Sequence, residues 1–457
     1  MTYLLLALLT VSEVGFIIFE GVRSSSKGTW SKRRLAVNIG QMVLFAVTLL
    51  LPGIDTSFRF KGLIILLSVR IIFAVISALI NRKKTVAKKM SGKVLSLIMS
   101  VLLITGAMFP AFLFTDYSGL PLHGPYGVKN CNAILVDESR IEKFENDGSY
   151  REVPVYFFYP ENAGADDRFP LVVFSHGAFG YYQSNVSTYM ELASHGYVVV
   201  SLEHPYHSFF TKDTDGKTVI VDQGFINSVM TTGQNGSEEE IFPVARDWME
   251  IRVGDMDFAL DELIKGADHM DTEDYRFENE NMKNCTLEAL KHTDTDKIGL
   301  MGHSMGGATA VEVGKERDDI DAVIDIDGTM LGSIAGAKNG KFIVEDIEYG
   351  VPLFELENMN AHQDAIEAEE IGYPYPNNMI RKNAATYYGT YFEGALHMDY
   401  TDLPMFSPAL AKMLGSGDVD NEYVMDTVNS LAVDFFDCYL KGEGQFSVNE
   451  SYPGAGK

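Results

Sequence analysis

The segment "GLMGHSMGGATA" at residues 299–310 sets one serine between two glycines, in the pattern Gly-x-Ser-x-Gly. A serine on a sharp turn between a strand and a helix exposes its hydroxyl group and can act as a nucleophile. Gly302 and Gly306 would permit the tight turn, and the small residues after it would let the helix pack closely on a sheet. Ser304 is therefore the predicted nucleophile, which needs a base, an acid and an oxyanion site.

The predicted base is His397. In folds with this turn the acid and the histidine follow the serine along the chain. Two histidines do so: His397 ends a strand-like run in "EGALHMDYTD", and His362 lies in the polar stretch "NMNAHQDA". A base just beyond a strand end can be held firmly toward the serine, which favours His397.

The predicted acid is Asp327, which would orient the imidazole and stabilise its charged form. The run "AVIDIDGTM" offers Asp325 and Asp327. Asp327 lies at the carboxyl end of the predicted strand, where the sites of open α/β sheets lie, whereas Asp325 is further inside. Glu355 and Glu357, in the next predicted strand, remain rivals.

An oxyanion hole needs two preorganised N–H donors. Met305, directly after the nucleophile, would supply one of them. The other should come from a loop after an earlier strand, and "VVFSHGAFG" at residues 172–180 has the required run of apolar residues followed by glycine. Ala178 is the predicted second donor, with Gly177 allowing the turn.

The elements that must position these residues follow an α/β pattern after residue 115. Strands are predicted at 153–159, 170–176, 197–204, 297–303, 321–327, 351–358 and 387–397, and helices at 183–195, 245–265, 305–316 and 424–441. Several strands are nearly continuous apolar runs, as expected when both faces are buried. The alternation predicts a mostly parallel sheet covered by helices. The segments 205–245 and 266–296 are interpreted as insertions that frame the site.

Charge divides the chain into two parts. The formal net charge is −26, but residues 1–114 contain 14 Lys and Arg against 3 Asp and Glu, so the remainder is strongly acidic. An acidic domain would repel phosphates, which argues against a nucleic-acid partner. The three widely spaced cysteines argue against a zinc site or a disulfide framework. His204 and His207 have ligand-like spacing, but without a surrounding set of carboxylates they are interpreted as loop residues near the site.

Residues 1–114 are predicted to form a membrane domain. Four apolar runs, at about 2–19, 36–52, 62–80 and 94–114, each approach the length that crosses a bilayer. Basic residues cluster after the first and third runs, so both of these loops are predicted to be cytoplasmic. Four crossings then place the N-terminus and residues 115–457 on the outer side of the cell membrane. Buried core helices are the alternative interpretation of the four runs.

Two charges lie well within the apolar runs. Glu13 is in the first run and Arg70 is in the third. A charge near the bilayer centre is costly and usually finds a partner inside the bundle. Their depths, counted along the two helices, predict an ion pair between Glu13 and Arg70.

Several stretches in order resemble the platelet-activating-factor acetylhydrolase family of α/β-hydrolases, the lipoprotein-associated phospholipase A2 type. They are "GLPLHGPYGV", "FPLVVFSHGAFG", "ELASHGYVVVSLEHPYHS", "IGLMGHSMGGATA", "IDIDGTM" and "EGALHMDYTD", within about residues 119–440. By motif the resemblance implies Ser304 as nucleophile, Asp327 as acid, His397 as base, and Ala178 and Met305 as oxyanion donors. The four apolar runs, the Gly328-Thr329 pair where a tryptophan often follows the acid, and the two insertions depart from the family.

We therefore expect a membrane-anchored serine hydrolase with an α/β-hydrolase domain, which needs no cofactor and no metal. Its expected substrates are carboxylic esters, and the resemblance implies short-acyl or oxidised phospholipids. Two alternatives remain open: a non-catalytic membrane sensor with a ligand-binding hydrolase-like domain, and an acyltransferase or peptidase of the same fold.

Overall fold

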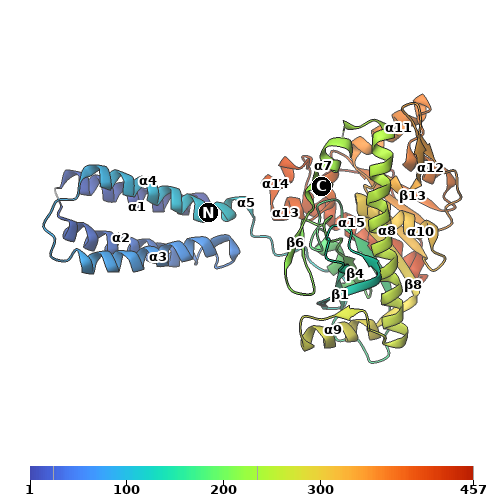
Figure 1. Ribbon diagram of the computed structural model, residues 1–457, viewed down its shortest axis with the longest axis horizontal. Helices are drawn as coiled ribbons and strands as arrows, with labels where there is room; N and C mark the ends of the chain where they lie inside the picture. The colour runs from blue at the N-terminus through green and yellow to red at the C-terminus, as the bar shows by residue number, and fades with distance from the viewer. Residues whose placement is uncertain (24, 234, 456–457) are drawn as a thin grey trace. The chain divides into compact units, whose positions relative to one another are not determined.

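The computed structural model describes residues 1–23, 25–233 and 235–455 (Figure 1). The chain divides into two compact units. One contains Met1–Ser118 and Met405–Leu410, and is called the helical unit below. The other contains Gly119–Pro404 and Ala411–Lys457, and is called the sheet unit.

The helical unit contains four long helices and one short one: α1 (Thr2–Val22), α2 (Lys27–Thr48), α3 (Phe58–Ile80), α4 (Met90–Ala107) and α5 (Phe109–Leu113). Consecutive long helices pack against each other, and α1 also packs against α4, so the four close into a bundle. The two basic segments between α1 and α2 and between α3 and α4 lie side by side, because the backbone N–H of Lys27 donates to the carbonyl of Val86.

The bundle is apolar outside and charged inside. Its exposed residues include Val11, Ile18, Ile65, Ile72, Phe73, Leu79 and Leu102. Inside, the carboxylate of Glu13 contacts the guanidinium of Arg70 and accepts hydrogen bonds from Arg34 at 2.5 Å and Gln41 at 2.8 Å. The predicted pair of Glu13 and Arg70 is confirmed. An apolar exterior around paired charges is typical of helices in a bilayer.

Within the described ranges, α1, α3 and α4 are long and apolar enough to cross a membrane. Helix α2 begins at Lys27, well before the apolar run at 36–52, because the Ser26 side chain caps it and accepts a hydrogen bond from the N–H of Thr29. Arg34, which the basic-loop argument places in a loop, therefore lies in a helix and faces Glu13. The last run is interrupted at Ala107, where α4 ends and α5 begins with Pro110 in its first turn.

The sheet unit is built around a sheet with the strand order β14-β13-β12-β9-β8-β3-β4-β2-β1-β7. The strands are β1 (Val128–Ile141), β2 (Tyr150–Pro160), β3 (Phe169–Ser175), β4 (Val198–Leu202), β7 (Tyr275–Arg276), β8 (Thr293–His303), β9 (Ala322–Ile326), β12 (Leu353–Glu357), β13 (Tyr387–Phe392) and β14 (Ser451–Tyr452). Pairing is parallel from β14 to β4 and antiparallel across β2, β1 and β7. All seven predicted strands are present, and the sheet also contains three that were not predicted, β1, β7 and β14.

The central strands are buried on both faces. Along β3, Leu171 and Val173 belong to one core, whereas Val172 and Phe174 belong to the other. The first core is covered by α8 (Glu238–His269), α9 (Glu280–Lys291) and α10 (Met305–Glu316), and the second by α6 (Val186–Ser194) and α15 (Asn421–Phe436) (Figure 1). This is the predicted mostly parallel sheet covered by helices.

The two predicted insertions contain structure of their own. Residues 205–233 and 235–245 contain the hairpin of β5 (Phe210–Lys212) and β6 (Thr218–Ile220), then α7 (Gln223–Ser228), a short π-helix (Val229–Gly233) and the start of α8. Residues 266–296 include β7 and α9. The remaining elements are β10 (Ile334–Ala337), β11 (Phe342–Val344), α11 (Met359–Ile371), α12 (Pro376–Asn383), α13 (Leu403–Phe406) and α14 (Pro408–Met413).

Candidate active site

Ser304 lies between the end of β8 and the start of α10, in a left-handed backbone conformation with φ of 57°. Such a φ is strained for a residue other than glycine and is found at tight functional turns. Both flanking glycines are required sterically. A Cβ on Gly302 would lie 2.2 Å from backbone atoms of Gly306, and one on Gly306 would lie 1.9 Å from the carbonyl oxygen of Ser175.

The structure brings Ser304, His397 and Asp327 together, with the His397 ring within hydrogen-bond distance of both other side chains. His397 Nε2 lies 3.0 Å from Ser304 Oγ, and His397 Nδ1 lies 2.5 Å from Asp327 Oδ2. The three residues follow β8, β9 and β13, which run parallel, so their carboxyl ends meet at one edge of the sheet. This arrangement lets the imidazole accept the serine proton while the carboxylate holds the other ring nitrogen.

Asp327 is held in place by Asn358, the residue after β12. The backbone N–H of Asn358 donates to Asp327 Oδ1 at 2.7 Å, and its side-chain amide donates to Oδ2 at 2.8 Å. Burial acts to raise the pKa of Asp327, but the charge and hydrogen bond of His397, together with the Asn358 donors, outweigh it and lower the pKa. Asp327 is therefore a carboxylate at neutral pH.

The His397 side chain keeps 41 % of its surface exposed, so solvent can reach the imidazole. Burial of the ring acts to lower its pKa, but the facing carboxylate of Asp327 and their hydrogen bond give a net rise. The backbone of His397 is fixed by His303, whose Nε2 lies 3.0 Å from the His397 carbonyl oxygen. Burial, with the nearby charge of His397, lowers the pKa of His303 to about 3, so His303 is neutral and donates this hydrogen bond.

The rival residues have other partners. His362 lies in the first turn of α11, where its Nδ1 is 2.9 Å from Glu357 Oε2. Arg381 forms ion pairs with both Glu355 and Glu357. The Asp325 carboxyl is fully buried and accepts a hydrogen bond from the N–H of Gly328 at 3.1 Å. None of these contacts includes Ser304, so the geometry favours the predicted choice of His397 and Asp327.

The two predicted oxyanion donors lie beside the nucleophile. A Cβ on Gly177 would lie 3.1 Å from Ser304 Cβ, so the loop after β3 runs directly against the serine. Met305 is the first residue of α10, and the N–H groups of a first helical turn have no partner within the helix. Among the hydrogen bonds of the described residues, none uses the N–H of Ala178. Ala178 and Met305 also belong to one apolar cluster with Phe225 and Trp248.

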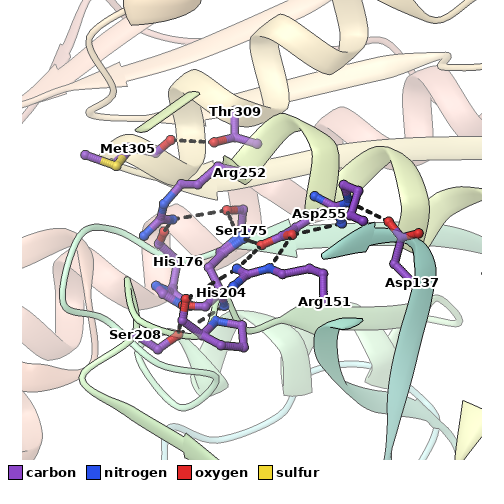
Figure 2. A network of polar contacts seen from close by, with 12 residues as sticks. Asp137, Arg151, Ser175, His176, His204, Ser208, Arg252, Asp255, Met305 and Thr309 are labelled. Atoms are coloured by element: carbon purple, nitrogen blue, oxygen red, sulfur yellow. Dashed lines mark hydrogen bonds and ion pairs between the residues drawn. The ribbon is translucent and has the colours of Figure 1, made fainter. Parts of the chain in front are cut away.

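A buried polar network lies beneath the loop after β3 (Figure 2). Ser175 Oγ is 2.9 Å from His204 Nε2, and His204 Nδ1 is 2.9 Å from Asp255 Oδ2. This serine–histidine–aspartate group has the same residue types and contacts as the candidate site, but all three side chains are inaccessible to solvent. Burial and the charge of Arg252 lower the pKa of His204 to about 4, and Arg151 forms an ion pair with Asp255 at 2.7 Å.

Within residues 1–23, 25–233 and 235–455, no group of three or more His, Cys, Asp and Glu side chains is arranged to hold a metal ion. His204 contacts Ser175 and Asp255, and the His207 ring stacks on Phe225 at 3.8 Å. Both histidines lie in the loop between β4 and β5, as the sequence interpretation has them, and both are buried there.

Sequence reasoning missed three residues that support the site. His303 lies inside the Gly-x-Ser-x-Gly motif, so its position was a usable signal. Asn358 directly follows a predicted strand, next to the rival Glu357, and an amide at a strand end was a weaker signal. Arg252 lies in the middle of a helix, far from every motif, and no pattern in the sequence marks it.

The sequence matches a family model described as platelet-activating factor acetylhydrolase, isoform II, over residues 149–453. The platelet-activating factor acetylhydrolase of Bos taurus is 26% identical over 306 residues, covering 62% of this chain and 60% of that protein. A probable 1-alkyl-2-acetylglycerophosphocholine esterase of Arthroderma benhamiae is 25% identical over 177 residues, covering 38% of this chain and 35% of that protein. The chain thus spans about 60% of the length of the first of these relatives.

Among solved structures, a ferulic acid esterase from Streptomyces cinnamoneus superposes with a TM-score of 0.50 at 20% identity, covering 71% of this chain and 93% of that one. A similarity at this identity concerns the fold alone, and it agrees with the predicted α/β-hydrolase architecture. The family match covers more than half of the chain and includes every candidate site residue. The chain belongs to the platelet-activating factor acetylhydrolase isoform II family.

Proposed function

We propose that this protein is a membrane-anchored serine esterase that cleaves carboxylic esters through an acyl-enzyme on Ser304. The observation that carries the proposal is the pair of hydrogen bonds that links Ser304 Oγ to the His397 ring and the His397 ring to the Asp327 carboxylate. Each of these contacts has the direction that nucleophilic catalysis needs.

Acylation begins when Ser304 Oγ attacks the ester carbonyl carbon. His397 Nε2 takes the hydroxyl proton, and the Asp327 carboxylate stabilises the imidazolium that forms. The carbonyl oxygen becomes an oxyanion, which accepts hydrogen bonds from the N–H groups of Ala178 and Met305. The imidazolium then returns its proton to the leaving alkoxide, and the alcohol departs.

Deacylation repeats these steps with water as the nucleophile. His397 takes a proton from water, and the hydroxide oxygen attacks the acyl carbon of the ester on Ser304. The second oxyanion occupies the same pair of N–H donors. When it collapses, Ser304 regains its proton from His397 and the carboxylic acid leaves. All groups required by this cycle are side chains or backbone of the chain itself.

We propose esters with an apolar acyl group as substrates, with short-acyl or oxidised phospholipids as the expected class. The apolar cluster that includes Ala178, Met305, Phe225 and Trp248 borders the proposed oxyanion donors and supports an apolar rather than a charged group at this side of the site. The names of the relatives from Bos taurus and Arthroderma benhamiae, an acetylhydrolase and an acetylglycerophosphocholine esterase, support short acyl chains on a phospholipid.

We further propose that the helical unit anchors the protein in the cell membrane, with the sheet unit on the extracytoplasmic side. The apolar exterior and paired interior charges of the bundle support insertion in a bilayer. The basic residues between α3 and α4, among them Arg82, Lys83 and Lys84, support a cytoplasmic position for that segment. A lipid bilayer would then present phospholipid substrates to the same protein that it anchors.

A substrate panel tests this function. Full-length protein in detergent micelles would be assayed against p-nitrophenyl acetate, p-nitrophenyl palmitate, a 2-acetyl phospholipid, a long-chain phospholipid and a long-chain triglyceride, with Ser304→Ala as the control. We expect the acetyl esters to be hydrolysed fastest and the control to be inactive. Faster turnover of the triglyceride would contradict the substrate class, and activity that survives Ser304→Ala would contradict the mechanism.

A further inference from the structure

Arg252 lies in the middle of α8, and among the described residues it is the largest whose side chain is fully buried. Its guanidinium does not point to a carboxylate: within the described residues, no ion pair of Arg252 exists at 4 Å or less. Instead its Nη1 donates to the carbonyl oxygen of His176, and its Nη2 donates to that of Gly177 at 3.1 Å. Both carbonyls belong to the loop that runs against Ser304. Figure 2 shows the Arg252 side chain directed toward His176.

Such an arrangement is costly for stability. A buried cation loses its hydration, and because no carboxylate of the described residues forms an ion pair with Arg252, the loss is only partly offset by its hydrogen bonds to carbonyl groups and by the nearby charge of Asp255. Burial lowers the pKa of Arg252 to about 9, which still leaves it charged at neutral pH. Ionisable groups with strongly shifted pKa values cluster at functional sites, so the position of Arg252 beside the Ser304 loop makes it a candidate for a role there.

The Gly177 carbonyl oxygen receives three donors. Besides Arg252 Nη2, the His176 ring lies 2.6 Å away through Nδ1, and the backbone N–H of Gly180 lies 3.1 Å away. The His176 ring is neutral, because burial and the charge of Arg252 lower its pKa well below the usual value, so its Nδ1 carries the one proton and donates it here. Its Nε2 then accepts from Ser208 Oγ at 2.8 Å.

These contacts determine where one particular N–H group points. The Gly177 carbonyl and the Ala178 N–H belong to the same peptide unit, which is planar and trans, so the two groups point in opposite directions. Donors gathered on the carbonyl side leave the N–H directed away from them. They also polarise the peptide, which makes the N–H a stronger donor.

We propose that Arg252 is a positioning residue for ester hydrolysis, which holds the His176 and Gly177 carbonyls so that the Ala178 N–H is aimed at the oxyanion. This inference rests on the proposed function. Arg252 does not touch the substrate, and it acts through one peptide group. The fixed N–H requires no rearrangement when negative charge develops on the ester oxygen.

The test uses Arg252→Lys and Arg252→Gln in the full-length protein. Lysine keeps the charge and glutamine keeps a planar donor, but neither can reach both carbonyls with two parallel N–H groups. The first readout is kcat and KM for p-nitrophenyl acetate. We expect kcat to fall by between about tenfold and the 10²- to 10³-fold that follows removal of an oxyanion donor, while KM changes by less than about threefold.

The second readout is the inhibition constant of a trifluoromethyl ketone. Ser304 Oγ adds to its carbonyl carbon, the C=O π bond breaks, the oxygen becomes an oxyanion and the serine proton passes to His397. The complex therefore depends on the oxyanion donors without any turnover. We expect the inhibition constant to rise by about the same factor by which kcat/KM falls, as for an analogue of the transition state. A loss of folded protein alone would not change this constant.

Arg151→Lys is the matched control, because Arg151 is also buried and pairs with Asp255 but bonds to neither loop carbonyl. We expect its kcat and its inhibition constant to stay near the wild-type values. An equal loss in Arg151→Lys, wild-type constants in the folded Arg252 variants, or failure of both variants to fold would overturn the proposal. A wild-type protein that neither hydrolyses the ester nor binds the ketone would instead overturn the proposed function.

Discussion

Asp325 and Asp327 are two residues apart, but their carboxyl groups have opposite surroundings. Asp327 Oδ2 contacts the His397 ring at 2.5 Å, and its pKa is lowered. Asp325 Oδ1 accepts one hydrogen bond from Gly328, its Oδ2 has no hydrogen-bond partner among the described residues, and burial raises its pKa well above the usual value. The first is a carboxylate that orients a base, and the second is a carboxyl group in the core whose charged form burial disfavours.

Asp327→Asn should therefore be far more damaging than Asp325→Asn. Loss of a triad acid can lower kcat by about 10⁴-fold, because the imidazole loses its orientation and its counter-charge. Asp325→Asn replaces a buried carboxyl group, which contacts neither Ser304 nor His397, by an amide of similar shape, so kcat should stay within about tenfold of the wild type. The measurement is kcat for p-nitrophenyl acetate, with both variants compared at equal folded protein. If Asp325→Asn or Glu357→Gln were the crippling change, the acid would be misassigned.

Ser304 should be the single serine that a fluorophosphonate probe labels within the short reaction time that saturates it. Its hydroxyl contacts His397 at a site that solvent reaches, whereas the hydroxyl of Ser175, with an equivalent contact to His204, is fully buried. Peptide mapping of the labelled protein would locate the probe, and Ser304→Ala should abolish both labelling and hydrolysis. Persisting label in Ser304→Ala would show that another residue is the nucleophile.

Ester hydrolysis should rise with pH through a single acid limb. His397 must be neutral to accept the serine proton, and its pKa is raised above the ordinary value of 6.5 because it faces Asp327. The apparent pKa of kcat/KM should accordingly lie above 6.5. In Asp327→Asn the residual activity should show this limb at lower pH, because the carboxylate that favours the imidazolium is gone. An acid limb that does not move in this variant would argue against the His397–Asp327 pairing.

Glu13→Leu should lower the folded yield of the full-length protein more than Arg70→Leu. Glu13 contacts both Arg34 and Arg70, so its loss leaves two interior cations without their carboxylate, whereas loss of Arg70 leaves Glu13 paired with Arg34. A single unpaired charge near the bilayer centre costs about 2.5–3.5 kcal/mol on insertion scales. Gel filtration in detergent would measure the monodisperse fraction. The double variant Glu13→Leu with Arg70→Leu should recover only part of the yield, because Arg34 remains, and full recovery would contradict the role of Arg34.

A cysteine at Asp215 should react with a membrane-impermeant maleimide in intact cells, and one at Lys83 should not. Both positions are exposed, so the difference would report the side of the membrane rather than burial. The background would carry Ser at Cys285 and Cys438, the two native cysteines that are partly exposed. Permeabilised cells supply the control in which both positions should react. Labelling of Lys83→Cys alone in intact cells would place the sheet unit in the cytoplasm.

The sheet was predictable because its central strands are read locally. Leu171 to Phe174 form an unbroken apolar run, and such a run is favoured only where both faces of a strand are buried. The turn at Ser304 was predictable because it requires glycine at positions 302 and 306 for steric reasons, and those two glycines are visible in the sequence. Strand ends then indicated Asp327 and His397, since parallel strands bring their carboxyl ends to one edge.

The support of the site was not predictable in the same way. Arg252 contacts the loop after β3 from the middle of α8, a helix that begins about 60 residues further along the chain. Only tertiary packing determines which turn of α8 faces this loop. Arg34 was misplaced for a related reason. A basic run after an apolar one indicates a loop, but the cap at Ser26 starts α2 before that run, and Glu13 gives one of its arginines an interior partner.

Because Ser175, His204 and Asp255 form the same kind of hydrogen-bonded group as the candidate site but lie in the core, labelling of Ser175 can report local opening of the fold. A serine reagent can reach Ser175 only when β3 or α8 moves away and the core opens, because its hydroxyl has no exposure in the closed fold. Slow appearance of label on Ser175, timed against the rapid reaction at Ser304, would thus report the free energy of that opening. One experiment would then give two rates: the rate of reaction at the accessible Ser304 hydroxyl, and the rate at which the core opens to expose the Ser175 hydroxyl.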